Sequence, residues 1–385
     1  MKDPIASVVR DMKPSGIRKF FDIVSEMKDA ISLGVGEPDF DTPWHIRDEG
    51  IYSLEKGRTF YTSNSGLMEL RREISKYIAK GTNITYDPKQ EVLITVGGSE
   101  AIDMGLRALI NPGDEVIIPQ PSYVSYEPCA ILAGGKPVIV ELEEKDEFRL
   151  TPEKLLGAIT EKTKVLILPF PNNPTGAIME REDLEKIVPI IKDHDIYVLS
   201  DEIYSELTYK GTHTSIASLP GMRERTILIN GFSKAFAMTG WRLGYACGPE
   251  NIISQMTKLH QYCIMCAPTT SQYAAIEALK HGERDVEEMR TAYNERRRFL
   301  MHEFRRMGLD CFEPYGAFYV FPSIKRFNMS SDDFAIKLLE AKKVAVVPGT
   351  AFGDCGEGFL RISYAYSIEN LKEALSRIEE FICCF

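Results

Sequence analysis

The chain has 385 residues, of which 44% are hydrophobic and 26% are charged, which is the composition of a globular protein long enough for two domains. Its net charge of −10 argues against a general affinity for nucleic acid or for an anionic membrane surface. No apolar run approaches the length that spans a bilayer, and the N-terminal residues lack the apolar core of a signal peptide, so we expect a cytoplasmic protein.

The first 45 residues contain too little apolar material for a domain of their own. We expect residues 1–45 to form an N-terminal arm and a part of a smaller domain that lies later in the chain. Residues 46–282 are predicted to form the large domain, and residues 283–385 the small one.

Short apolar runs alternate with helical patterns through the predicted large domain. Runs rich in Val and Ile that are apolar almost throughout are typical of strands buried on both faces, as in a mostly parallel sheet. The pattern predicts an α/β fold whose sheet is sandwiched by helices. The predicted strands are 91–96, 115–119, 136–142, 164–170, 196–200, 226–230 and 243–248, and the clearest helices are 100–110 and 181–194.

The pattern changes after residue 282, where one long charged helix is predicted. Short strands at "GAFYVFPS", "VAVVPG" and "GFLRISYA" follow, with a helix near 332–342 and a last helix from Glu369. This order is typical of a smaller α+β domain.

Polar residues follow four of the predicted strands directly. Taken alone, each has an ordinary structural interpretation: a Gly-Gly-Ser turn at 97–99, a proline-directed turn after Asn173, and a helix N-cap at Asp201. Ligands of open α/β sheets bind outside the carboxyl ends of the strands, however. The four positions together therefore predict one site, which includes Ser233 and Lys234 after the fourth strand.

One ligand accounts for the whole set. A phosphate would be bound at the start of a helix and by an arginine fork, an aspartate would hold a protonated ring nitrogen, and a lysine would form an imine with an aldehyde. Pyridoxal 5′-phosphate has all of these groups. The residues assigned to it are Gly98, Ser99, Ser233 and Arg242 for the phosphate, Asp201 for the ring nitrogen, Asn173 and Tyr204 for the ring hydroxyl, and Lys234 for the aldehyde.

The sequence also resembles the fold-type I pyridoxal-phosphate aminotransferases, in the branch with bacterial and archaeal aspartate, aromatic and N-acetyl-diaminopimelate aminotransferases. The motifs that carry this resemblance span nearly the whole chain and include "SLGVGEPDF", "PNNPTG", "SDEIY", "SKAFAMTGWR" and "RISYA". The resemblance implies a transaminase that moves the amino group of an L-amino acid to a 2-oxo acid, with 2-oxoglutarate as the expected acceptor.

Further roles follow from the resemblance alone. It implies that Lys234 also shuttles protons, that Tyr123 stacks on the cofactor ring, and that Glu100 belongs to the cofactor-binding turn. Arg361 would bind the substrate α-carboxylate, helped by Gly36 and Asn173. The alternative is a surface ion pair, but the setting of Arg361 between apolar residues in "GFLRISYA" argues against it. Tyr61 would reach the phosphate from a second subunit, which implies a homodimer.

The substrate is the least determined feature. We find no second arginine for a distal carboxylate and no basic residue at Ser99, and segments such as "SGIRKFFDI" (15–23) are similar to the N-acetyl-diaminopimelate and aromatic subgroup. We therefore expect a neutral, aromatic or N-acetyl-diaminopimelate-like substrate. The alternatives are an aspartate aminotransferase and a β-elimination lyase on the same fold.

Other classes of protein fit less well. The motif "GVGEPD" has Asp39 where a dinucleotide-binding loop needs its third glycine, which argues against a dehydrogenase. Gly98 lies too near the N-terminus to leave room for the DNA-binding domain of a regulator. His260, Cys263 and Cys266 recur every three residues, but further ligands at metal-site spacing are missing, so no metal is expected.

Overall fold

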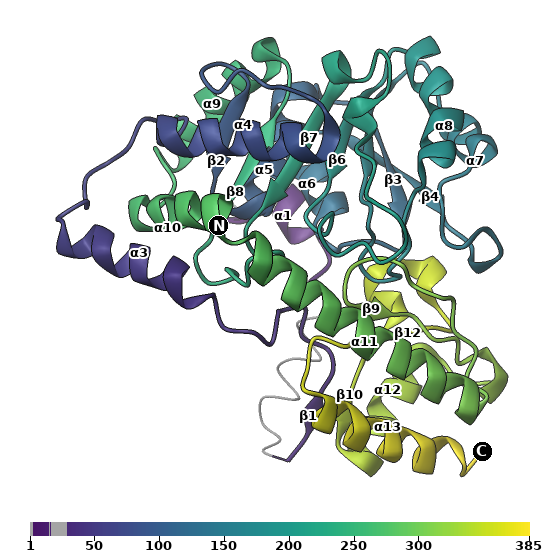
Figure 1. Cartoon of the computed structure of the whole chain (residues 1–385). Helices are drawn as coiled ribbons and strands as arrows, with labels where there is room; N and C mark the ends of the chain where they lie inside the picture. The colour runs from purple at the N-terminus through teal and green to yellow at the C-terminus, as the bar shows by residue number, and fades with distance from the viewer. Residues whose placement is uncertain (1–2, 15, 17–28) are drawn as a thin grey trace.

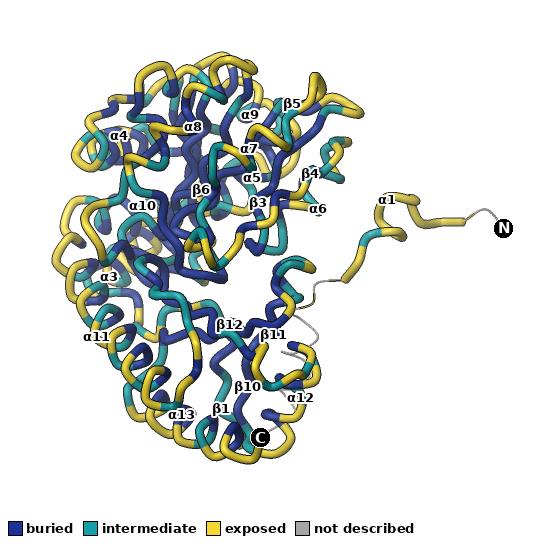
Figure 2. The backbone as a smooth tube through the Cα atoms, turned by 90° about the vertical axis from the view of Figure 1, so that its right-hand side faces the viewer, coloured by how far each residue is buried: buried dark blue, intermediate teal, exposed yellow. Residues whose placement is uncertain are grey.

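The computed structural model describes residues 3–14, 16 and 29–385. Within the predicted arm, residues 1–2, 15 and 17–28 lie outside the described residues. They include all of the segment 15–23 except Gly16. Of the described part of the arm, helix α1 (Ser7–Arg10) has no buried residue. It stands apart from the body of the chain (Figure 2).

A seven-stranded sheet forms the centre of the large domain, and its strands match the seven predicted ones (Figure 1). Their order across the sheet is β2-β8-β7-β6-β5-β3-β4. Strand β8 runs antiparallel to both of its neighbours, whereas the other pairs are parallel. The strands are β2 (Val92–Thr95), β3 (Glu115–Gln120), β4 (Lys136–Glu141), β5 (Thr163–Leu168), β6 (Tyr197–Asp201), β7 (Thr226–Gly231) and β8 (Gly244–Cys247).

Helices cover both faces of the sheet, which explains why the strands lack an apolar–polar alternation. In β5, Leu166 and Leu168 belong to the core on one face, while Val165 and Ile167 belong to the core on the other. The mostly parallel α/β fold is confirmed. The helices of this domain are α3 (Trp44–Glu55), α4 (Met68–Thr82), α5 (Gly97–Leu109), α6 (Tyr126–Leu132), α7 (Pro152–Ala158), α8 (Arg181–Asp193), α9 (Glu250–Cys263) and α10 (Thr269–His281).

The small domain combines three helices with short strands, as predicted. Its helices are α11 (Glu283–Met307), α12 (Ser331–Lys342) and α13 (Ile368–Ile382). Strand β12 (Leu360–Ser363) lies between β11 (Val347–Pro348) and β9 (Tyr319–Val320) and is antiparallel to both.

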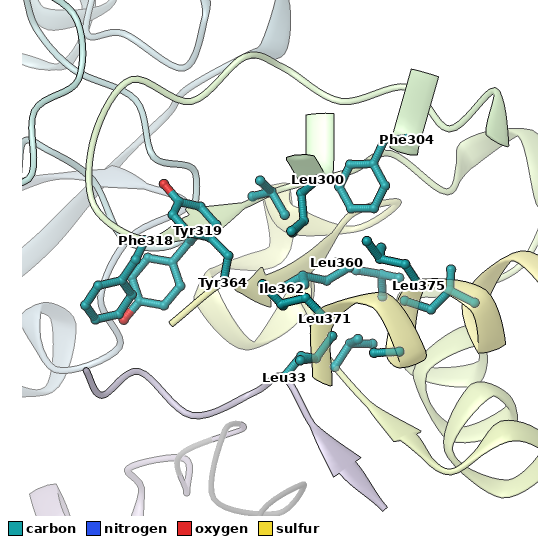
Figure 3. Close-up of a cluster of buried hydrophobic side chains, with 14 of the residues drawn as sticks. Leu33, Leu300, Phe304, Phe318, Tyr319, Leu360, Ile362, Tyr364, Leu371 and Leu375 are labelled. Atoms are coloured by element: carbon teal, nitrogen blue, oxygen red, sulfur yellow. The ribbon is translucent and has the colours of Figure 1, made fainter. Parts of the chain in front are cut away.

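The core of the small domain also contacts residues of the large domain, such as Tyr204 and Leu207. In this cluster Phe318, Tyr319 and Tyr364 gather at one end, away from Phe304 and Leu375 at the other (Figure 3). Strand β1 (Ile31–Ser32) pairs in parallel with β10 (Val344–Ala345), which ties the N-terminal segment to this domain. The boundaries at 45/46 and 282/283 remain predictions.

Among the described residues, no helix combines the length and the apolar character that a membrane span requires.

Candidate active site

A cavity of about 600 Å³ lies where the carboxyl ends of the parallel strands meet the small domain. This volume is within the range of small-molecule sites. The predicted site residues that line it are Gly36, Gly98, Ser99, Tyr123, Asn173, Asp201, Tyr204, Ser233, Lys234, Arg242 and Arg361. Of the predicted set, only Tyr61 and Glu100 are not among the lining residues.

One end of the cavity is a glycine turn that faces an arginine. Helix α5 starts at Gly97, which has φ +75°, and a Cβ atom there would lie 2.8 Å from Arg242 Nη2. Only glycine allows this backbone angle and this close approach together. The first N–H groups of α5, at Gly98 and Ser99, therefore lie beside the guanidinium, and the arrangement suits an anion.

Glu100 supports this turn from outside the cavity. Its carboxylate accepts a hydrogen bond from the backbone N–H of Val96 (2.5 Å) and pairs with Nδ1 of the buried His260 (2.8 Å). The Glu100 side chain thus holds the strand end that precedes the turn, and the role of Glu100 in binding the cofactor stays a prediction. The Glu100–His260 pair was not predicted, because the two residues lie 160 positions apart.

Lys234 follows β7 and projects into the middle of the cavity. Its Nζ donates a hydrogen bond to the Gly36 carbonyl (2.6 Å) and lies 5.7 Å from the ring centre of Tyr204 and 5.6 Å from that of Phe318. Burial lowers the pKa of Lys234 to about 8, against the opposing effect of the Glu37 carboxylate. The amine therefore loses its proton far more readily than a lysine in water.

Asp201 ends β6 and is almost fully buried. It accepts hydrogen bonds from the Tyr126 hydroxyl (2.8 Å) and from the Ile203 N–H (3.2 Å). No helix begins at Asp201, so the interpretation as an N-cap is wrong. Burial raises the pKa of this carboxyl, while the bond from Tyr126 opposes the rise.

Arg361 on β12 is only 2% exposed, so the interpretation as a surface ion pair is wrong. It donates one hydrogen bond to Asn173 Oδ1 (2.9 Å) and another to the Gly34 carbonyl. Its Nε has no hydrogen-bond partner within the part of the chain that the structure describes. A buried guanidinium that lines a cavity and is bonded only to neutral oxygens among the described residues is suited to bind a carboxylate.

The chain is also similar to known proteins. The sequence model of the family described as aminotransferase class I and II matches residues 28–378. The chain belongs to this family. The transaminase is 50% identical to the aspartate aminotransferase of Pyrococcus abyssi, with 96% of each chain covered. It is 45% identical to a probable N-acetyl-LL-diaminopimelate aminotransferase of Bacillus subtilis, with 97% of this chain and 94% of that one covered.

Solved structures agree with this membership. The fold superimposes with a TM-score of 0.90 on the aromatic aminotransferase from Pyrococcus horikoshii, which is 48% identical and covers 94% of this transaminase and 98% of its own chain. The resemblance found in the sequence motifs is confirmed, and the enzyme is a transaminase that uses pyridoxal 5′-phosphate.

The residues of the cavity fit this cofactor. A turn suited to an anion, a buried carboxylate that could hold a ring nitrogen and the lysine amine all line it, and the charges of Arg242 and Asp201 both act on the pKa of Lys234. Tyr61 is 77% exposed and does not line the cavity of this chain. A tyrosine exposed to this degree is available for a contact with a second chain.

Two aromatic residues of the cavity were missed by the sequence analysis. Tyr126 begins α6 and meets the ring of Tyr123 edge-on, with 5.6 Å between the ring centres. The i,i+3 spacing of helices could not have indicated this contact, because Tyr123 precedes the helix. Tyr319 on β9 forms a hydrogen bond between its hydroxyl and that of Tyr204 (2.8 Å). No local pattern links two residues that are 115 positions apart.

Proposed function

We propose that this enzyme transfers the amino group of a neutral, aromatic or N-acetyl-diaminopimelate-like L-amino acid to 2-oxoglutarate, with Lys234 as the residue that binds the cofactor covalently. The observation that carries the proposal is the pairing of two buried groups in one cavity. Lys234 contributes an amine with a lowered pKa to the lining, and Arg361 contributes a buried guanidinium that is bonded only to neutral oxygens among the described residues. An amino acid needs both, one for its reacting Cα and one for its carboxylate.

The remaining lining residues hold the cofactor at its other groups. Gly98, Ser99, Ser233 and Arg242 bind the phosphate, Tyr123 stacks on the ring, and Asn173 and Tyr204 hold the ring hydroxyl. Asp201 keeps the ring nitrogen protonated, since a buried carboxylate is stabilised by a cation beside it. The hydrogen bond from Tyr126 fixes its orientation.

Bound pyridoxal phosphate supplies an aldehyde that accepts the substrate amine and a ring that delocalises the electron pair left at Cα. The chain contributes the proton transfers. Lys234 would leave its covalent bond as a free amine, and because burial disfavours its charged form it would be available to remove the Cα proton. It then returns the proton to the cofactor carbon. Since one base serves both atoms, no second group has to diffuse into place.

The charges of the cavity favour a substrate without a distal carboxylate. Among the described residues of one chain, the lining cations are Lys234, Arg242 and Arg361, and each already has a role. Glu37 adds a negative charge to the lining. An aspartate side chain would therefore meet repulsion and no free cation.

Aspartate aminotransferase is the second candidate, because a relative with that name is 50% identical. A panel of phenylalanine, glutamine, N-acetyl-LL-diaminopimelate and aspartate, each with 2-oxoglutarate, separates the two candidates. We expect kcat/KM for one of the first three to exceed that for aspartate at least about tenfold. A preference for aspartate would reverse the assignment. Pyruvate and ammonia formed without an acceptor would instead indicate a lyase.

A homodimer completes the proposal. Phe60 and Tyr61 are strongly exposed, and Leu54 near the end of the preceding helix α3 is exposed as well. Apolar side chains gathered in this way are typical of an interface. In the dimer, Tyr61 of one subunit would reach the phosphate in the other, in the cytoplasm where we expect the enzyme.

A further inference from the structure

Tyr319 contacts three parts of the active site at once. Its hydroxyl is 2.8 Å from the hydroxyl of Tyr204, and its ring lies 4.6 Å below the Arg361 guanidinium. A Cβ atom on Gly36 would overlap the same hydroxyl, so only glycine leaves room for it. Tyr319 thus joins the residue proposed for the cofactor hydroxyl to the one proposed for the substrate carboxylate.

The direction of the Tyr319–Tyr204 hydrogen bond is fixed once the cofactor is present. A phenol has a single proton to donate. When Tyr204 donates that proton to the cofactor ring oxygen, its own oxygen can only accept from Tyr319. A donor that itself accepts a hydrogen bond is polarised and donates more strongly.

The surroundings of Tyr319 make it a good donor in this chain of bonds. Burial raises the pKa of the Tyr319 phenol, which keeps the proton on, and the Arg361 guanidinium opposes the rise. The other ionisable groups that act on Tyr204 and Tyr319 are Asp201, Lys234, Tyr123 and Glu37.

We propose that Tyr319 is a positioning residue that donates to Tyr204, strengthens the bond from Tyr204 to the cofactor ring hydroxyl, and supports Arg361 with the face of its ring. This inference rests on the proposed roles of Tyr204 and Arg361. The hydroxyl of Tyr319 acts on the cofactor through Tyr204, and the ring of Tyr319 acts on the substrate through Arg361. The two functions can therefore be removed separately.

The test of the hydroxyl is an absorbance titration of the holoenzyme. The pH midpoint of the visible absorbance change reports the proton on the linkage between Lys234 and the cofactor, which a stabilised ring oxygen releases more easily. We expect Tyr319→Phe to raise this midpoint by about half a pH unit to one unit. In a Tyr204→Phe background the same substitution should add no further shift, because the pair acts as one unit.

The matched control is Tyr364→Phe. It removes another buried phenol hydroxyl, bonded to the Ala317 carbonyl (3.0 Å), from a residue that does not line the cavity. It should leave the midpoint unchanged, although it can lower the unfolding temperature as Tyr319→Phe does. A shift in this control as large as that in Tyr319→Phe would overturn the proposal.

The test of the ring is a comparison of KM with kcat. Tyr319→Phe keeps the aromatic face, so KM for the amino acid should change less than about twofold, whereas Tyr319→Leu should raise KM about threefold to tenfold.

No shift of the midpoint in Tyr319→Phe, or an equal shift with Tyr204 already replaced, would overturn the role of the hydroxyl. Equal KM values for the Phe and Leu variants would overturn the role of the ring. Unmodified enzyme that shows no visible absorbance with added cofactor would instead refute the proposed function itself.

Discussion

The floor and the wall of the active-site cavity are built from the chain in different ways. The floor comprises Gly98–Ser99, Asn173, Asp201 and Ser233–Lys234, and its residues end or follow the strands β2, β5, β6 and β7 of one sheet. The wall comprises Gly36, Tyr319 and Arg361, which come from three segments that are distant in the sequence. The floor is thus organised by the rule that parallel strands end at one edge, while the wall depends on how the small domain packs.

This difference assigns separate tasks to the two regions. The floor offers groups for a phosphate, a ring nitrogen and an aldehyde, all of which belong to the cofactor. In the proposed function, the wall offers the substrate the Arg361 guanidinium, which the face of the Tyr319 ring supports. Substitutions in the two regions should therefore affect different measured quantities.

The largest expected effect lies on the floor. Lys234→Ala removes the base that serves both proton transfers, so kcat should fall about 10⁴-fold or more. The variant should still bind pyridoxal phosphate through the phosphate end, which equilibrium dialysis can measure. The control is Lys258→Ala, because Lys258 is exposed on α9. Activity within tenfold of the unmodified enzyme would rule out the assigned role.

The two arginines test the comparison directly. Arg361→Ala should lower kcat/KM about 10²–10³-fold through a higher KM for the amino acid, with little change in cofactor affinity. Arg242→Ala should raise the cofactor Kd about 10- to 100-fold and affect KM less.

Arg361→Lys sharpens this test, because it keeps the charge but loses the planar fork. It should recover only part of the loss of Arg361→Ala. If Arg361→Ala mainly weakened the cofactor and Arg242→Ala mainly weakened the substrate, the two roles would have to be exchanged.

Tyr126→Phe should have a smaller effect. It removes one hydrogen bond to Asp201, whose net value is about 0.5–1.5 kcal/mol. We expect kcat to fall about twofold to tenfold with an unchanged KM, because the contact lies on the cofactor side. Steady-state kinetics with Tyr364→Phe as the matched control checks this. A change confined to KM would place Tyr126 on the substrate side instead.

The smallest expected effect concerns how the rate of covalent cofactor attachment depends on pH. In the proposed function, the neutral form of Lys234 reacts with the cofactor aldehyde, and burial lowers the pKa of this lysine to about 8. In cofactor-free enzyme, the rate of covalent attachment should therefore rise with pH and level off about one unit above that value. With the ordinary value of 10.5, the rate would keep rising about tenfold per pH unit through pH 9. A stopped-flow absorbance series between pH 6 and 10 distinguishes the two.

The sequence predicted the floor well because its determinants are local. Each strand of the large domain is an apolar run, and the polar residues that follow it are fixed in place by the strand itself. Asp201 and Lys234 could therefore be placed at one sheet edge from the order of strands and polar residues alone. The alternative interpretation of Asp201 as a helix cap is wrong, because the chain turns after this residue without forming a helix.

The wall could be predicted only through the resemblance to a family, and even then in part. Arg361 was identified by its motif, yet its contacts with Asn173 and Gly34 depend on packing between domains. Tyr319 was missed, because nothing in "GAFYVFP" indicates a partner 115 residues earlier.

The amino-acid sequence alone determined the order of the elements, the mostly parallel sheet and the set of groups that a cofactor phosphate, ring and aldehyde require. These follow from hydrophobic periodicity and from the chemistry of side chains at strand ends, which act over a few residues. The tertiary structure decided which buried groups meet: Tyr126 with Asp201, Tyr319 with Tyr204, and Glu100 with His260. Such contacts form only when distant segments pack together, since burial excludes water and leaves each polar group dependent on the partner that packing brings to it.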